Sequence, residues 1–164
     1  MKRIAIYISL LLTFLALSGC AGVTPTGGNY QKAVAQSGKS KAIVLRLPST
    51  LYKDRLPAVQ LDGQFVGFLP DGGFLEIDTT PGSHTLTLAA HEEYARRWRW
   101  KPFSIQIDLK DKMTYFYEVD IFMDNFQTVL LASRWNDKVT MKPVAEDKAM
   151  QTLPSLQKTL ITDK

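Results

Sequence analysis

Short apolar segments separated by turn residues run through the chain from about residue 42 to residue 142. The clearest is Phe103–Leu109, where apolar residues alternate with Ser, Gln and Asp, as in a strand with one buried face. Residues 42–47 are instead a mostly apolar run that ends before Pro48. This spacing predicts an all-β fold, either an antiparallel β-sandwich or an open barrel.

Turn residues set the expected ends of the strands. Asp62-Gly63 supplies the two residues with positive φ of a type I′ hairpin turn, and it separates residues 59–61 from residues 64–68. With that two-residue loop, Val59 pairs with Val66. The shared face of this hairpin is predicted to hold Val59, Leu61, Val66 and Phe68.

The same two signals predict the remaining strands. Thr80-Pro81-Gly82-Ser83 has Pro and Gly where a type II turn needs them. Asp124-Asn125 is expected to be a further turn between two strands. The other expected strands cover residues 74–79, 85–90, 115–122, 126–135 and 139–142.

Both ends of the chain differ from this β region. Residues 20–41 are rich in Gly, Ser, Thr and Gln, and such a composition predicts a flexible tether. Residues 144–153 contain good helix formers and follow Pro143, which is suited to a helix start. We therefore expect a β-sandwich domain over residues 42–142, and one short helix and a tail within residues 143–164.

Residues 1–19 have the layout of a secretory signal peptide: two basic residues, an apolar run over residues 4–17, and small residues before Cys20. Leu17-Ser18-Gly19-Cys20 resembles the bacterial lipobox, whose cysteine is acylated and becomes the mature N-terminus. A membrane-spanning anchor would need about 18 or more apolar residues, and a plain secretory signal would leave Cys20 as a free thiol. The resemblance would place Asp after the cysteine in a lipoprotein held at the inner membrane, so Ala21 at this position implies delivery to the outer membrane.

Composition narrows the possible chemistry. Cys20 is the only cysteine, so no intramolecular disulfide and no zinc–thiolate site is expected. The net charge of +4 reflects 20 basic and 16 acidic residues, and removal of Lys2 and Arg3 with the signal peptide leaves 18 basic residues and a charge of +2. We therefore expect no nucleic-acid partner.

Several segments together resemble a known family: residues 42–46, 61–69, Thr80-Pro81-Gly82-Ser83-His84, and Tyr115-Phe116-Tyr117. They are similar to a family of small Gram-negative lipoproteins whose shared domain has no known function. The segments around Asp62-Gly63 and Pro81-Gly82 also look like the PEGA domain, a surface β module. The resemblance implies a β-sandwich in the cell envelope and no set of catalytic residues.

Candidate catalytic and metal-binding residues are few. His84 and His91, seven positions apart on one strand, would face opposite sides, so neither a metal site nor a cofactor is expected. A Ser-His-Asp hydrolase would need a serine on a strained turn, and Ser83 only neighbours His84 in sequence. We expect no enzyme, and the alternative is a small envelope hydrolase or polysaccharide-modifying enzyme with an unrecognised site.

Residues 96–101 are the most unusual candidate for a contact surface. In an extended conformation Arg97, Arg99 and Lys101 would share one face, with a bend expected at Pro102. The segment is either a solvated strand end or a contact site for an envelope protein or anionic polymer. It consists of Arg96, Arg97, Trp98, Arg99, Trp100 and Lys101. The sequence thus predicts a non-enzymatic outer-membrane lipoprotein that is held to the membrane by acylated Cys20 and docks a partner in the envelope.

Overall fold

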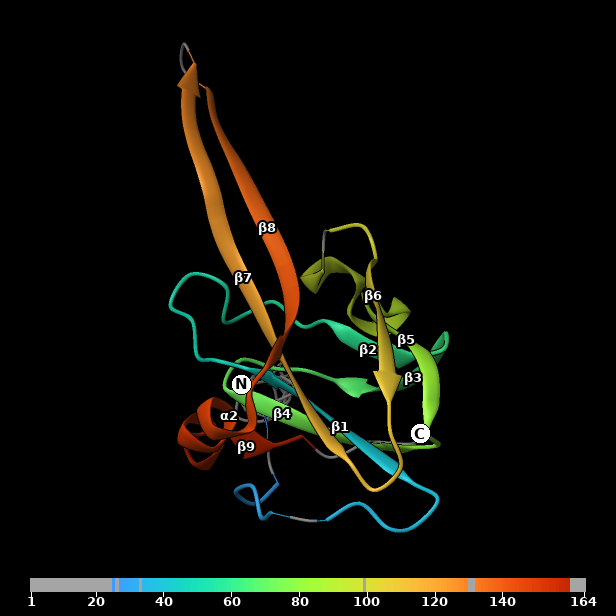
Figure 1. Ribbon diagram of the computed structural model, residues 1–164. Coiled ribbons are helices and arrows are strands. Elements are labelled where there is room, and N and C mark those ends of the chain that lie inside the picture. Colours follow the sequence, from blue (N-terminus) through green and yellow to red (C-terminus); the bar gives the residue numbers. More distant parts are fainter. Residues whose placement is uncertain (1–24, 26, 33, 99, 130–131, 160–164) are drawn as a thin grey trace, which may run out of the picture.

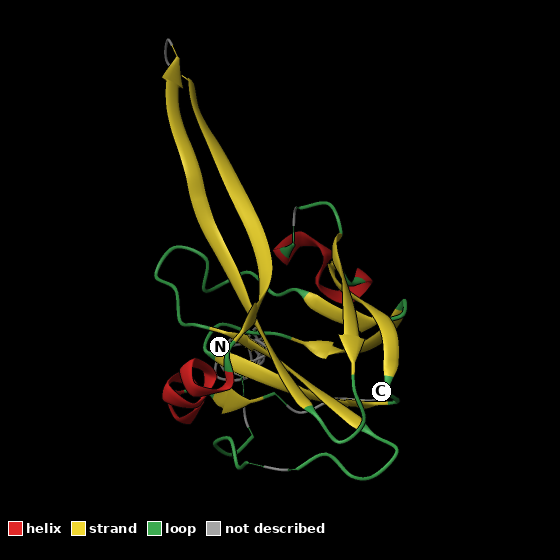
Figure 2. Cartoon of the chain, in the orientation of Figure 1, coloured by secondary structure: helices red, strands yellow, loops and turns green. Residues whose placement is uncertain are grey.

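The computed structural model describes residues 25, 27–32, 34–98, 100–129 and 132–159, and within them the chain forms two β-sheets with a short C-terminal helix outside (Figures 1 and 2). The all-β prediction is confirmed as an open sandwich rather than a closed barrel. Sheet A has the strand order β8-β7-β1-β4-β9, and sheet B has the order β3-β2-β5-β6. Sheet A comprises β1 (Ser40–Arg46), β4 (Gly73–Thr79), β7 (Thr114–Val129), β8 (Ala132–Val144) and β9 (Gln157–Lys158), and sheet B comprises β2 (Ala58–Leu61), β3 (Gln64–Phe68), β5 (Gly82–Ala89) and β6 (Phe103–Leu109).

The main core lies between the two sheets. Leu86 and Leu88 of β5 are fully buried there, facing Val44 of β1 and Leu75 of β4 in the same cluster. The alternation seen along Phe103–Leu109 is confirmed, because Ile107 and Leu109 are buried while Gln106 and Asp108 are exposed. The period-two pattern therefore predicted correctly which side of β6 faces the core.

Strand β1 is buried on both faces. Its residues Ile43 and Leu45 pack with Leu153 and Leu156 on the outer face of sheet A, where α2 (Glu146–Thr152) and the 3₁₀ helix η2 (Leu153–Ser155) lie. β1 pairs in parallel with β7, and β9 pairs in parallel with β4, so sheet A is mixed rather than wholly antiparallel. A strand covered on both faces has a continuous apolar sequence, as residues 42–45 do.

The β2–β3 hairpin turns at Asp62-Gly63, as predicted, with φ of 51° and 80°. Next to the turn the register is the predicted one, with Leu61 opposite Gln64 and Gln60 opposite Phe65. The predicted pair of Val59 with Val66 is wrong, because Val59 pairs with Gly67 and Val66 lies in a β-bulge. Val66 still packs against the main core, whereas Phe68 is part of a separate cluster with Leu56 and Ala58 outside sheet B. The bulge turns one hydrophobic residue to the opposite face.

The expected turn at Asp124-Asn125 is wrong. β7 continues through these residues to Val129, and β8 returns from Ala132 as its antiparallel partner. The register shifts between Met123 and Asn125, so Asp124 lies in a bulge of a continuous strand while Asn125 pairs with Asn136. The expected strands 126–135 and 139–142 are therefore the distal end of this hairpin and part of β8.

Beyond its last pair with β1, at Val119, β7 pairs only with β8 within the described chain. We call the described residues 120–129 and 132–140 the arm. At about 3.3 Å per residue, the ten residues from Val119 to Val129 extend about 33 Å, and Figure 1 shows the arm projecting from the sandwich.

The described part of the expected tether contacts the domain. Gly27 and Gly28 exchange backbone hydrogen bonds with Lys158 of β9, and a Cβ on Gly27 would lie 2.6 Å from the Lys158 carbonyl oxygen. Tyr30 packs edge-on against Phe74, and Ala35 is buried. The domain thus begins before residue 42, and the helix predicted over residues 144–153 is Glu146–Thr152.

Candidate binding site at the base of the arm

Arg46, the last residue of β1, organises the loop that follows it. Its side chain is 2 % exposed, and its guanidinium donates hydrogen bonds to the carbonyl oxygens of Tyr52 and Arg55. It also lies 3.4 Å from a carboxylate oxygen of Asp71, which accepts a hydrogen bond from the Ser49 amide. The five donors of a guanidinium suit such a set of convergent oxygens. One buried cation therefore fixes the course of residues 47–57.

Burial lowers the pKa of Arg46 from its ordinary value, and the negative charges of Asp71 and Asp120 oppose that change. The guanidinium remains charged, because arginine is not deprotonated in proteins. A buried cation of this kind is tolerated only where it is paired and hydrogen-bonded. Arg46 can therefore be buried only because the loop carbonyls and the carboxylates offset the loss of its hydration.

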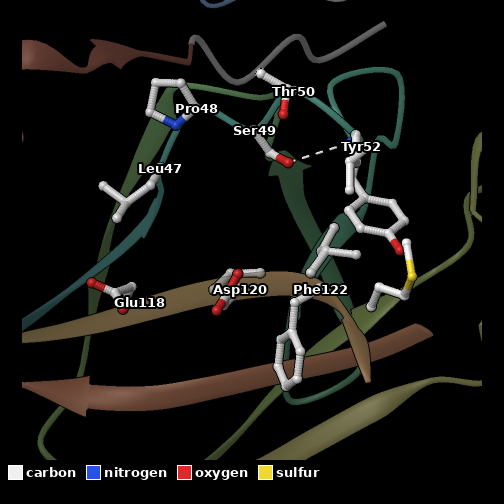
Figure 3. Close-up of a pocket in the computed structure, with 12 residues that line it drawn as sticks. Leu47, Pro48, Ser49, Thr50, Tyr52, Glu118, Asp120 and Phe122 are labelled. Carbon is white, nitrogen blue, oxygen red and sulfur yellow. Dashed lines mark hydrogen bonds between the residues drawn. The ribbon is translucent and has the colours of Figure 1, made fainter. Parts of the chain in front are cut away.

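A cavity of about 460 Å³ lies between this loop and β7. The loop contributes residues 47–52 to its lining, and β7 contributes residues 118–123. Figure 3 shows the two segments facing each other, and Tyr52 donates its amide proton to the Ser49 hydroxyl at 3.3 Å. The volume is within the range of ordinary ligand pockets, about 300 to 1,000 Å³.

Two carboxylates lie on the β7 side of the cavity (Figure 3). Glu118 is 9 % exposed at its side chain and forms an ion pair of 3.1 Å with Lys142 of β8. Asp120 is exposed and has no ion pair with a described residue. Because side chains two apart on a strand share a face, both carboxylates lie on the same side of β7, where Lys142 neutralises Glu118 and Asp120 carries the negative charge left unpaired within the described chain.

Tyr52 connects the cavity loop to the arm. Its hydroxyl donates a hydrogen bond of 2.7 Å to a carboxylate oxygen of Asp137 in β8, and its ring packs edge-on against Trp100. The side chain is only 7 % exposed. A movement of the loop would therefore have to break this contact with the base of the arm.

The predicted basic and aromatic patch over residues 96–101 does not form as one exposed surface. Trp98 is 3 % exposed, belongs to the main core and packs against Trp100 at 4.8 Å between ring centroids. The preceding residues form a 3₁₀ helix, η1 (Glu92–Arg97), rather than an extended strand. Burial of the large Trp98 ring in the core outweighs the charge pattern that suggested an exposed strand.

The other residues of that segment are placed separately. Arg96 and Lys101 are exposed, Arg97 donates from Nε to the Asp54 carbonyl at 2.9 Å, and Trp100 is half-buried. Arg99 lies outside the described residues. The structure thus keeps two exposed cations here but does not combine them with an exposed tryptophan pair.

His84 is held by two acceptors. Its Nδ1 lies 2.7 Å from Asp62 Oδ2, and its Nε2 lies 2.9 Å from the Thr80 carbonyl oxygen. The hydrogen bond to Asp62 raises the pKa of His84 above its ordinary 6.5, although burial opposes the increase. Because both ring nitrogens face oxygen acceptors, only the protonated ring donates to both. Neither nitrogen is free to accept a proton from Ser83, so this is no hydrolase triad.

His91 lies beyond the other end of β5 and caps η1, where its Nδ1 accepts a hydrogen bond from the Glu93 amide. Its ring packs against Phe65 at 4.8 Å and Phe68 at 5.1 Å between centroids. The structure therefore does not bring the two histidines together. Neither of them lines the cavity.

Cys20, the predicted lipidation site, lies outside the described residues. No helix among the residues that the structure describes has the length and apolar character needed to cross a membrane. The described residues also contain no cluster of three or more His, Cys, Asp or Glu side chains placed to hold a metal ion.

Sequence reasoning missed the residues that shape the cavity: Arg46, Tyr52, Glu118 and Asp120. One signal for Arg46 was present, because a lone charge inside the apolar run AIVLRL is unusual. Its oxygen partners come from residues 52, 55, 69 and 71, and no spacing rule links them.

Comparison of the chain with models of protein families, with curated proteins and with solved structures found no match. The resemblance to a lipoprotein family and to the PEGA domain therefore stays a prediction.

Proposed function

We propose that the chain is a lipid-anchored, non-enzymatic β domain of the outer membrane that uses its arm to bind a partner in the cell envelope. The observation that carries this proposal is the arm itself: a paired hairpin about 33 Å long that leaves the sandwich with both outer strand edges unpaired in the described chain. Long open edges favour unwanted pairing and are usually blocked or covered, so an arm with two of them favours a contact role.

The attachment of the tether supports this arrangement. Gly27 is hydrogen-bonded to Lys158, so the chain from an acylated Cys20 to this backbone contact with the domain is only seven Cα–Cα steps long. Fully extended, seven residues span about 25 Å. The domain would therefore stay close to the bilayer, and the arm would supply a reach of its own.

The position of that attachment also matters. β9 and β8 are the two opposite edge strands of sheet A. In Figure 1 the tip of the arm and β9 lie toward opposite ends of the view. A chain anchored next to β9 would leave the arm free to reach a partner away from the anchoring point.

The anchor is tested by Cys20→Ser in cells. The substitution should abolish labelling with fatty acid and release the protein from the membrane fraction, because two or three acyl chains would supply the attachment. Normal processing and membrane retention of Cys20→Ser would contradict the lipid anchor.

The docking role is tested by site-specific photo-crosslinking in cells. A crosslinker at Gln127, which pairs with Arg134 in the arm, should give a discrete adduct with another protein. The same group at Asp108, an exposed position on β6, is the matched control and should not give it. Equal adducts from both positions, or none from Gln127, would contradict binding through the arm.

A further inference from the structure

We propose that the cavity at the base of the arm binds an extended, basic polypeptide segment of a partner protein, which adds as a strand to the free edge of β7. This inference rests on the proposed function, because it names the class of partner that the domain would bind. It also specifies where on the molecule the main-chain contacts form.

The first support is the open edge of β7. β1 pairs with β7 only as far as Arg46 and Val119, whereas β7 continues as a strand. The cavity is lined by residues 118–123 of β7 and by no described residue of β8, so it lies on the side that β1 occupies lower in the sheet. An unpaired edge presents a row of amide and carbonyl groups to whatever enters that space.

The second support is the space beside that edge. After Arg46 the chain turns away at Leu47-Pro48, and the loop anchored by Arg46 forms the opposite wall. A strand needs about 4.8 Å from its neighbour, and four residues of it extend about 13 Å. The cavity of about 460 Å³ lies where β1 would have continued, so an added strand would prolong an interrupted ladder.

The third support is charge. Asp120 is exposed beside the cavity and has no ion pair with a described residue, whereas Glu118, on the same side of β7, is already paired with Lys142. Lys or Arg side chains of an incoming strand would pair with Asp120, whereas an anionic polymer would be repelled. The cavity therefore favours a basic polypeptide over acidic envelope material.

The fourth support is the apolar rim. Leu47 is 41 % exposed and Leu51 is 69 % exposed, and both belong to the loop that lines the cavity. A strand presents alternate side chains to opposite sides. A segment in which basic and apolar residues alternate would place cations near Asp120 and cover one or both leucines.

The test uses the purified full chain and two labelled eight-residue peptides, one of alternating Lys and Val and one of alternating Glu and Val. Fluorescence anisotropy should show binding of the Lys-Val peptide and none of the Glu-Val peptide. Asp120→Lys should weaken binding at least about ten-fold, because attraction is replaced by repulsion. Asp108→Lys changes another exposed strand aspartate, outside the cavity, and should leave binding unchanged.

Hydrogen exchange separates strand addition from a contact made by charge alone. Saturation with the Lys-Val peptide should slow exchange of amides within residues 120–123, and a peptide N-methylated on every residue should bind at least about ten-fold more weakly. Three results would each overturn the proposal. They are equal binding of the compared peptides, unchanged affinity of Asp120→Lys for the Lys-Val peptide, and unchanged hydrogen exchange in β7. A dimer of the free chain that Asp120→Lys converts to monomer would also overturn it, because a second copy would then occupy the edge.

These failures can be distinguished from failure of the proposed function. The crosslinking at Gln127 in cells reports any partner of the arm, whatever its chemistry. A persistent adduct at Gln127 together with no Lys-Val binding would reject the basic strand and keep the docking role. Absence of any adduct from the crosslinker at Gln127 would reject the docking role itself.

Discussion

Strand β1 and the distal part of β7 belong to the same sheet, yet their surroundings are opposite. β1 pairs with a strand on each side, and its residues 42–45 are at most 1 % exposed. β7 beyond Val119 pairs with β8 alone and leaves the sandwich. The buried strand β1 thus stabilises the fold, whereas the distal part of β7 extends away from it. The boundary between these two roles lies at Arg46, where β1 ends.

Of the substitutions proposed as tests, Arg46→Ala should reduce the free energy of unfolding most. The substitution removes the donor for at least two loop carbonyls and the ion-pair partner of Asp71. Loss of one member of a buried charged network costs about 3 to 5 kcal/mol of the free energy of unfolding. Urea denaturation of the full chain measures it. Arg96→Ala, which removes an exposed arginine, is the control and should change stability by no more than about 0.5 kcal/mol.

Gly63→Val should have the next largest effect and act within the sandwich. Gly63 has a φ of 80°, and a built Cβ would meet no atom within 4 Å, so backbone conformation rather than space is the constraint. A β-branched residue there should cost about 1 to 3 kcal/mol. Gly63→Asn keeps a residue that tolerates positive φ and should cost clearly less. Equal losses for both variants would place the constraint elsewhere.

His84 should give a smaller effect that depends on pH. Its pKa is raised by Asp62, so the stabilisation is fully present below about pH 6.5 and is lost as the pH rises through the raised value. The hydrogen bond to His84 lowers the pKa of Asp62 below 3.8, so the same stabilisation is also lost in strong acid. Thermal unfolding from pH 5 to pH 9 should show a decline that His84→Asn removes. A decline of the same size in His84→Asn would assign it to other groups.

Shortening of the arm should have the smallest effect on stability. Replacing residues 124–136 by Asn-Gly joins the paired residues Met123 and Asp137 through a two-residue hairpin loop and keeps the hydrogen bond of Tyr52. The free energy of unfolding should change by less than about 1 kcal/mol, because the main core retains every buried residue assigned to it. A large loss of stability would show that the arm is part of the folding core.

The sequence predicted features that depend on neighbouring residues. The turn at Asp62-Gly63 and the buried side of Phe103–Leu109 follow from local φ preference and strand periodicity, and both are confirmed. The bulge at Val66 was missed because the turn fixes only the pairs beside it, and the shift at Val59 accompanies packing of Val66 on the main core and of Phe68 in a separate cluster.

Features that depend on distant contacts were not predictable in the same way. Asp124-Asn125 has turn chemistry, but the pairing of β7 with β8 on both sides of these residues outweighs it. Trp98 lies between charged neighbours in the sequence, and only the folded core shows that it is buried. The cavity could not be found from a motif, because its two walls are about seventy residues apart in the sequence.

Sheet A also determines when the chain can finish folding. Lys41 of β1 pairs with Thr114, and Gly73 of β4 pairs with Gln157 near the last described residue. Pairing such distant residues requires closing a long loop, and the entropy lost in doing so precedes any favourable contact. Proteins dominated by such pairings therefore fold in milliseconds to seconds rather than microseconds. In an exported chain, as we propose this one to be, the central strand β1 emerges early and has no β7 partner until most of the polypeptide has followed. The topology thus delays completion of the sandwich until residues 114–158 have been made, a delay that would suit the export in an unfolded state that we propose.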